Sequence, residues 1–231
     1  MTWQRWIRRA LRESGTGHFH VLLATLLSVI FLKGFEAEHP WVHNVSNMGI
    51  GLVLIAAWRS TSDSRKARVV GWVVLAAWGL LKLGSWVWEL DEGKTDSLLI
   101  LIFGWIVVRM VLALMRREQV SAQIISGSLC AYLLIGFWFW AAYGLVYALD
   151  HAAFLPIASD VKPASLPEER GDLFYFSFVT LTSLGYGDVT PVSAMARTLA
   201  ILQVIFGQFY LAVLIARQVG LYLVQKRGDQ A

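Results

Sequence analysis

The stretch TLTSLGYGDVTP, at positions 180–191, places two glycines, a tyrosine and an aspartate between two long apolar runs. Gly185 and Gly187 flank Tyr186, and Asp188 follows directly. Because glycine has no Cβ, it adopts left-handed backbone angles that L-residues resist, and it can turn successive carbonyls the same way. Irregular backbone of this kind is tolerated at membrane depth where protein buries it or where it lines an aqueous path. The stretch therefore predicts a backbone that turns its carbonyl oxygens toward a shared axis.

The surrounding sequence indicates that this stretch lies in a membrane. Hydrophobic residues make up 57% of the 231 residues, and 11 of the residues are Trp, which is far more apolar than a soluble domain tolerates. Apolar runs of about the length that crosses a bilayer fall at 18–35, 44–60, 69–89, 97–115, 122–149 and 193–224. We therefore predict an all-α, polytopic membrane protein with six transmembrane helices.

A shorter apolar segment at about 171–182 leads into the glycines and predicts a re-entrant helix. Asp172 near its start suits the positive end of a helix dipole. About a dozen residues rise about 18 Å, which reaches near the bilayer centre and turns the negative helix end toward a cation. The chain then returns outward, with Leu184 and Tyr186 expected to point back into the surrounding protein.

Charged residues predict the orientation of the chain. Most basic residues near the span ends, including Arg8, Arg65 and Arg116, fall on one side of a six-span map. Since such residues stay on the cytoplasmic side, both termini are expected there, with residues 150–192 facing outward. Acidic residues gather on the outer side, where they would attract cations. This topology accounts for the net charge of +4, so no nucleic-acid partner is predicted.

The glycine stretch resembles the selectivity filter of the tetrameric potassium channel family, which is written T-V-G-Y-G followed by Asp. This sequence reads S-L-G-Y-G-D from residue 183 to residue 188. The resemblance implies a homotetramer, because a closed ring of carbonyls takes four chains. It also implies filter residues Ser183, Leu184, Gly185, Tyr186 and Gly187, with K+ held by the carbonyls of the first four and by the Ser183 hydroxyl.

The context of the motif agrees with this resemblance, while two positions depart from it. Thr180 and Thr182 stand where the family has threonines, and Pro191 precedes a long final helix. The family's threonine and valine are replaced by Ser183 and Leu184. Both replacements keep the oxygen ligands, but serine lacks the methyl that stiffens the threonine rotamer. Potassium selectivity is favoured, and weaker discrimination against sodium stays open.

Several residues are expected to support the filter. Val179 stands where some family members place a glutamate that pairs with the filter aspartate, so that pair is absent. Tyr175 takes the place of a tryptophan that often hydrogen-bonds this aspartate. We therefore predict a brace from Tyr175 to Asp188, with plain aromatic packing of Tyr175 as the alternative.

The last apolar run contains the candidate gating residues. Gly207 lies twenty residues after Gly187, the spacing at which many family members bend their inner helix. Glycine weakens a helix by about 1 kcal/mol relative to alanine, so a hinge is feasible. Close helix packing would select a glycine equally well. Leu211, Ile215 and Val219 repeat at four-residue spacing and predict an apolar constriction.

The chain is expected to divide into two parts. Residues 1–118 form a basic amphipathic segment followed by four helices that resemble the peripheral domain of six-helix channels, and residues 119–231 form the pore domain. The fourth run contains Arg109 in place of a ladder of arginines, which predicts no strong voltage gating. Lys82 and Arg109 are intramembrane charges that are either functional or extend to the interfaces. The short ends of the chain predict no cytosolic ligand-sensing domain.

These patterns together predict a potassium-selective channel of the plasma membrane that conducts K+ passively among membrane lipids. K+ is the permeant ion, no cofactor is predicted, and we predict no enzymatic activity. The alternatives are a weakly selective monovalent cation channel and, in a different class, a non-conducting membrane scaffold or a carrier.

Overall fold

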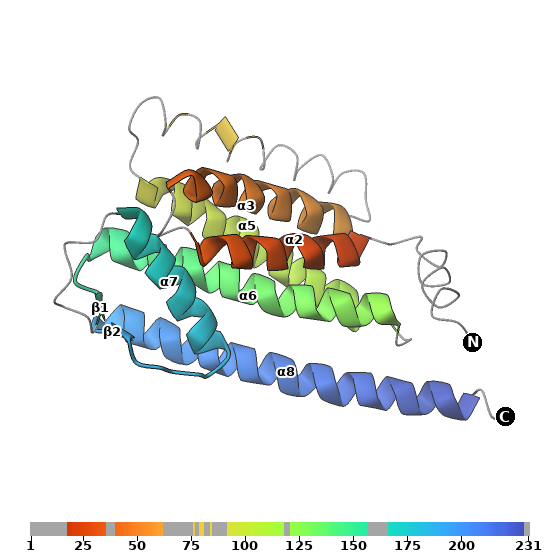
Figure 1. Ribbon diagram of the computed structural model, residues 1–231. Helices are drawn as coiled ribbons and strands as arrows, with labels where there is room; N and C mark the ends of the chain where they lie inside the picture. Colours follow the sequence, from red (N-terminus) through yellow and green to blue (C-terminus); the bar gives the residue numbers. More distant parts are fainter. Residues whose placement is uncertain are drawn as a thin grey trace.

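A computed structural model describes residues 18–35, 40–61, 76, 79–80, 84, 92–117, 121–156 and 166–228. The described part is mostly helical (Figure 1). Its helices are α2 (His18–Lys33), α3 (Pro40–Thr61), α5 (Glu92–Met115), α6 (Ala122–Leu149), α7 (Leu166–Leu181) and α8 (Ala194–Gly228). The antiparallel strands β1 (Phe154–Pro156) and β2 (Val189–Pro191) form a short ribbon that the all-α prediction did not include.

Three described helices are long and apolar enough to cross a membrane. They contain the segments Ser97–Met115, Ala122–Leu149 and Ala194–Val224, which match three of the predicted spans. The first two predicted spans are helical, but the apolar parts of α2 and α3, Phe19–Lys33 and Val45–Arg59, are shorter. The predicted span at 69–89 lies almost wholly outside the described residues. Six spans therefore remain a prediction.

Helix α6 forms the centre of the described structure. It packs against α2 and α5 on one side and against α7 and α8 on the other (Figure 1). Its sequence contains no charged residue and no proline, so nothing interrupts the helix. The hydroxyl of Ser121 accepts a hydrogen bond from the Ile124 N–H at its start. At its end, the Asp150 N–H donates to the Val146 carbonyl.

An aromatic cluster joins the helices on the two sides of α6. The ring of Phe137 on α6 lies 5.8 Å from Phe103 on α5 and 5.3 Å from Phe174 on α7, measured between centroids. Phe178 on α7 lies 5.8 Å from Phe137 in an edge-to-face arrangement. Such aromatic pairs stabilise packing by about 0.5–1.5 kcal/mol beyond area burial. The cluster therefore holds α7 at a fixed angle to the bundle.

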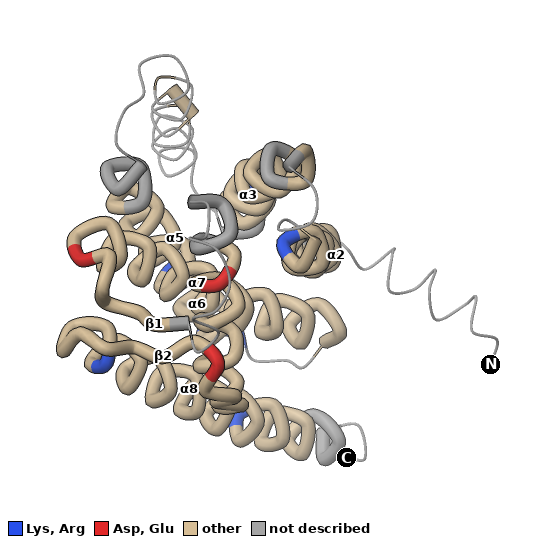
Figure 2. Tube along the Cα trace, turned by 60° about the vertical axis from the view of Figure 1, so that its left-hand side comes forward, with Lys and Arg blue, Asp and Glu red and all other residues tan. Residues whose placement is uncertain are grey.

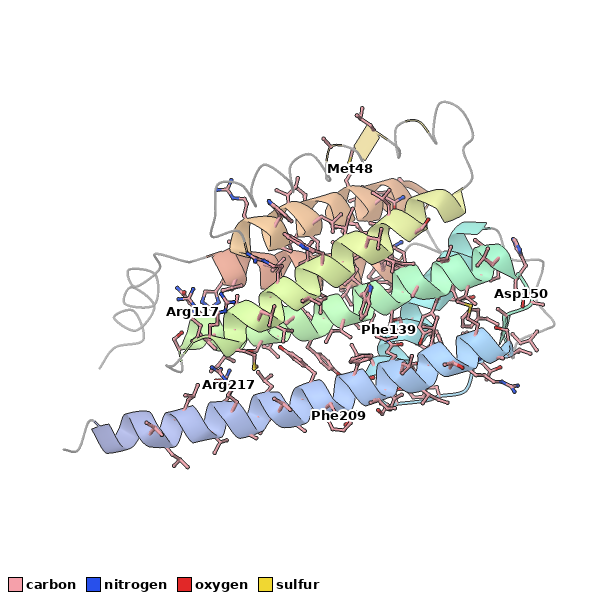
Figure 3. The ribbon with its side chains drawn as sticks, turned by 180° about the vertical axis from the view of Figure 1, so that it is seen from behind. Met48, Arg117, Phe139, Asp150, Phe209 and Arg217 are labelled. Carbon is pink, nitrogen blue, oxygen red and sulfur yellow. The ribbon has the colours of Figure 1, made fainter. Side chains whose placement is uncertain are left out.

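Helix α8 runs alongside α6 at the edge of the bundle, and α7 crosses between them (Figure 1). At a rise of 1.5 Å per residue, its 35 residues span about 52 Å, which is more than the hydrocarbon core of about 30 Å. Charged residues are sparse on the described helices (Figure 2). Arg117 and Arg217 lie at one end of the bundle and Asp150 lies at the other (Figure 3).

Candidate functional site

Helix α7 positions the glycine stretch. It begins at Leu166 rather than near residue 171 as predicted, so Asp172 lies in its second turn. The expectation that Asp172 sits at the positive helix end is therefore wrong. Beyond the C-terminal end of α7, the coil turns back alongside α8 toward β2 (Figure 1). We call residues 183–187 of this coil the glycine segment.

A hydrogen-bonded turn at Ser183 and Leu184 caps the C-terminal end of α7. The Leu184 N–H donates to the Val179 carbonyl at 3.0 Å, and the Ser183 N–H donates to the Thr180 carbonyl at 3.0 Å. These are the two bonds of a Schellman motif, in which the residue after the cap adopts left-handed angles. Glycine usually takes that position, whereas here Ser183 does so with a φ of 59°. The turn thus begins the glycine segment with a strained residue.

The sign of φ alternates along the glycine segment. Ser183, Gly185 and Gly187 have φ values of 59°, 58° and 80°, and these three are the described residues with positive φ. Left-handed angles at Gly185 and Gly187 were predicted, whereas the angle at Ser183 was not. Alternating hands allow successive N–H groups to turn to one side of a backbone and the carbonyls to turn to the other.

The side chains of Leu184 and Tyr186 were expected to point back into the surrounding protein. Within the described part of this chain they are 59% and 69% exposed. A single chain does not contain the neighbouring copies that the resemblance implies, so this expectation stays a prediction.

Ser183 has a polar partner on α8. The amide nitrogen Nε2 of Gln208 donates to Ser183 Oγ at 2.9 Å. Thr182, by contrast, turns its hydroxyl back to α7, where Oγ1 donates to the Phe178 carbonyl at 2.7 Å. Gln208 was not predicted as a site residue, although a glutamine directly after Gly207 in an apolar run is a recognisable signal. The Ser183 hydroxyl, which was expected to bind an ion, is thus hydrogen-bonded to a side chain of α8.

Asp188 lies at the outer end of the glycine segment and is braced by α7. The Tyr175 hydroxyl donates to Asp188 Oδ2 at 2.6 Å, which is the hydrogen bond that the sequence suggested. The Val189 N–H donates to Asp188 Oδ1 at 3.0 Å. The bond from Tyr175 is the main cause that lowers the pKa of the Asp188 carboxyl below its ordinary value. Asp188 is therefore favoured in its charged form.

A buried polar network ties α7 to the helices on both sides. The Tyr143 hydroxyl on α6 donates to Gln203 Oε1 on α8 at 2.6 Å. Gln203 Nε2 lies 2.9 Å from both the carbonyl and the hydroxyl of Ser177 on α7. The Ser177 hydroxyl donates to the Gly136 carbonyl at 2.8 Å. Sequence reasoning missed this network, although a glutamine and a serine inside apolar runs are the signal for one.

The end of α7 rests on Gly207. A Cβ added at Gly207 would lie 2.9 Å from the carbonyl oxygen of Leu181, so a larger residue would displace backbone. The same carbonyl accepts a hydrogen bond from the Tyr132 hydroxyl at 3.1 Å. Helix α8 runs without interruption through this point. Gly207 thus serves close packing in this structure, and a hinge there remains a prediction.

The C-terminal half of α8 contains the candidate constriction residues and Arg217, which was not predicted as a site residue. Leu211, Ile215 and Val219 lie on α8, and the last two are more than half exposed, so their constriction role also remains a prediction. Arg217 donates to the carbonyls of Met115 and Arg117 at the end of α5. An arginine inside the last apolar run was the missed signal. This contact joins α8 to the end of α5.

Of the two candidate intramembrane charges, the structure describes Arg109, which lies on α5. The Arg109 guanidinium lies 5.6 Å from the centroid of the Trp105 ring, which stacks on Trp58. Lys82 lies outside the described residues. Among the residues that the structure describes, no group of three His, Cys, Asp or Glu side chains has the spacing to hold a metal ion.

Comparisons with known proteins assign the region around this site. Residues 133–222, which run from α6 through the glycine segment into α8, match a family model described as "Ion channel". The chain is 35% identical over 92 residues to Protein LctB of Bacillus caldotenax, covering 38% of this chain and 64% of that protein. It is 37% identical over 87 residues to Protein LctB of Geobacillus stearothermophilus, covering 38% and 62%.

These matches span less than two thirds of the length of both relatives. No solved structure gives a significant match. The family match supports an ion channel, and together with the three apolar helices it indicates a membrane protein.

Proposed function

We propose that this protein is a potassium-selective channel whose filter is the glycine segment. The alternation of positive φ at Ser183, Gly185 and Gly187 is the observation that carries the proposal. Such alternation is compatible with four successive carbonyls on a common side, which is the arrangement that replaces the hydration shell of K+ in potassium filters. Ion coordination then falls to the carbonyls and hydroxyl of Ser183 and to the carbonyls of Leu184, Gly185 and Tyr186.

The position of the glycine segment supports this reading. It begins two residues after the end of α7 at Leu181, and it lies inside the region matched by the ion-channel family. Non-helical backbone at membrane depth is tolerated where protein buries it or where it lines an aqueous path. In this proposal, the filter is supported by residues of α7 and of the coil that follows it, namely Tyr175, Thr180, Thr182 and Asp188. Helix α7 directs its negative end inward, where it favours a cation.

A homotetramer is part of the proposal. Each chain supplies one glycine segment, and a ring of carbonyls requires several segments around one axis. The exposed side chains of Leu184 and Tyr186, together with the exposed face of α8, provide surface for neighbouring copies. K+ would pass along the shared axis, past Gly207 and the constriction at Leu211, Ile215 and Val219.

The proposed topology has six spans, with residues 1–118 peripheral and residues 119–231 forming the pore. Arg117 and Arg217 occupy one end of the bundle and Asp150 the other, which fits a cytoplasmic basic end and an outer acidic end (Figure 3). Both termini would then be cytoplasmic in a plasma-membrane protein. A single arginine, Arg109, within α5 supports weak voltage dependence at most.

A flux assay on the purified full chain in liposomes tests the proposal. The native protein and Gly185→Ala are compared for K+ and Na+ uptake, with Gly220→Ala as the matched control. Alanine at a φ of 58° strains each chain by about 1–2 kcal/mol, and four strained segments meet in one filter. Gly220 has no positive φ and nothing lies near an added Cβ.

Selective K+ uptake that Gly185→Ala abolishes and Gly220→Ala preserves is the expected result. Comparable Na+ uptake by the native protein would favour the weakly selective channel. Uptake coupled to a second ion would favour a carrier, and absence of uptake would favour a non-conducting scaffold.

A further inference from the structure

The hydrogen bond from Gln208 to Ser183 links α8 to the glycine segment, and Gln208 lies outside the sequence motif. We propose that Gln208 is a positioning residue for ion selectivity, because it fixes the Ser183 hydroxyl at the inner end of the glycine segment. The inference rests on the proposed channel function. It adds a specificity-determining residue from α8 to a filter otherwise built from one segment.

The first argument concerns the freedom of a serine side chain. A serine hydroxyl has three staggered positions, and no β-branch restricts the choice among them. An ion ligand on such a rotor would spend part of its time turned away from the ion. The Nε2 donor of Gln208 selects one position, in which it lies 2.9 Å from Ser183 Oγ. The hydrogen bond thus supplies the restraint that a branched side chain would supply by sterics.

The second argument concerns the oxygen atom itself. A hydroxyl oxygen has two lone pairs, and the bond from Gln208 uses one of them. The other lone pair stays available for a cation. The Gln208 amide is uncharged, so it orients the oxygen without adding a cation that would repel K+. Donation from an amide is therefore compatible with ion binding at the same atom.

The third argument concerns how the glutamine is held in place. Gly207 packs directly on the Leu181 carbonyl, so α8 touches the end of α7 one residue before Gln208. Gln203, on the same helix, is fully buried, and its side-chain amide forms hydrogen bonds with Tyr143 and Ser177. Gln208 is exposed within the chain and turned to the glycine segment instead. The two glutamines therefore have separate roles, one in packing and one at the ion path.

A double-mutant cycle in the liposome assay tests the inference. The Na+/K+ flux ratio is measured for the native chain, Gln208→Leu, Ser183→Ala and the double variant. Gln208→Leu removes one hydrogen bond, and the net contribution of a hydrogen bond corresponds to a rise of the Na+/K+ flux ratio by about threefold to tenfold. The double variant should equal Ser183→Ala, because coupled residues are non-additive. Gln218→Leu, the same change farther along α8, should leave the ratio unchanged.

A second substitution at the same position, Gln208→Glu, tests the inference if Gln208→Leu does not assemble. Gln208→Glu keeps a hydrogen bond of reversed direction, since the Ser183 hydroxyl can donate to the carboxylate. It should keep a ratio closer to the native value than Gln208→Leu does, because an added charge attracts Na+ and K+ alike. Tetramer content, measured by native mass spectrometry, is checked for every variant.

The outcomes separate the inference from the proposed function. A K+-selective native protein whose ratio Gln208→Leu leaves unchanged would overturn the inference and keep the channel. Multiplying effects in the double variant would also overturn it, because Gln208 would then act independently of Ser183. A native tetramer that conducts no K+ would overturn the proposed function, and the inference with it.

Discussion

Helices α6 and α8 are both long and apolar enough to cross a membrane, yet the chain covers them very differently. Within their most apolar stretches, 67% of the residues of α6 are buried, compared with 11% of those of α8. Among the described helices, α6 packs against α2, α5, α7 and α8, whereas α8 packs mainly against α6 and α7 and reaches the end of α5 through Arg217. Hydropathy alone does not distinguish a helix that is buried within its own chain from a helix whose surface is left to contact lipid or other copies.

The polar residues on the two helices sharpen this contrast. The hydroxyl of Tyr143 on α6 is fully buried and donates to Gln203 on α8. On α8, Gln208 is exposed within the chain and reaches the glycine segment. Helix α8 is therefore the element that faces the proposed ion path, and α6 is the scaffold that holds it.

The largest expected effect comes from the open face of α8. Phe209 is 68% exposed and projects away from the bundle (Figure 3). If this face contacts other copies, Phe209→Ala removes packing worth about 3–5 kcal/mol at each site, and the tetramer should dissociate. Met48→Ala on α3, at a side chain that is 74% exposed, serves as the control and should assemble normally. Native mass spectrometry measures the oligomer. Equal tetramer content in both variants would place Phe209 against lipid.

A somewhat smaller effect is expected where α8 touches α7. Gly207→Ala would force a Cβ against the Leu181 carbonyl, and overpacking of this kind costs about 1–3 kcal/mol. Gly220→Ala on the same helix meets no atom within 4 Å and should be neutral or slightly stabilising. Thermal unfolding in detergent compares the two variants. If Gly207→Ala unfolds at the native temperature, the close contact does not stabilise the fold, and the hinge interpretation gains weight.

The buried network between α6 and α8 gives the next prediction. Tyr143→Phe leaves Gln203 Oε1 buried without its donor, which costs about 1–3 kcal/mol. Tyr222→Phe changes an exposed side chain on α8 and should alter stability by less than about 0.5 kcal/mol. Denaturant unfolding of both variants measures the difference. An unchanged free energy of unfolding for Tyr143→Phe would contradict the role assigned to this network.

The smallest effect is expected at the outer end of the glycine segment. The bond from Tyr175 lowers the pKa of Asp188, so the brace persists while Asp188 is charged and is lost as pH falls through that lowered pKa. Tyr175→Phe removes this cause, and the pKa should rise toward the ordinary value of about 4. Acid inhibition of K+ flux should then begin at a higher external pH. Identical pH profiles for the variant and the native protein would argue against the brace.

The sequence predicted the parts of this site that depend on residue type alone. The left-handed angles of Gly185 and Gly187 follow from the missing Cβ. The bond from Tyr175 to Asp188 was suggested by the family resemblance, with plain aromatic packing as the alternative, and the structure shows the bond. The positive φ of Ser183 arises from the hydrogen bonds that end α7, which no single residue encodes. The partner of Ser183 on α8 depends on how two distant segments pack, so spacing within one segment could not reveal it.

Fold prediction succeeded and failed for similar reasons. Long apolar runs specified α5, α6 and α8, because hydropathy reports helices of spanning length directly. The ribbon of β1 and β2 was missed, since three-residue strands show no periodicity. A single chain does not show which surfaces another copy covers, so the surroundings of Leu184 and Tyr186 stay a prediction.

The reversal potential of the native protein in a planar bilayer, with K+ on one side and Na+ on the other, tests the central claim most directly. A potassium filter made by the glycine segments predicts a reversal potential displaced strongly toward the K+ equilibrium value. Gly185→Ala should abolish this current. A reversal potential near zero would contradict potassium selectivity, and an intact tetramer that passes no current would contradict the pore.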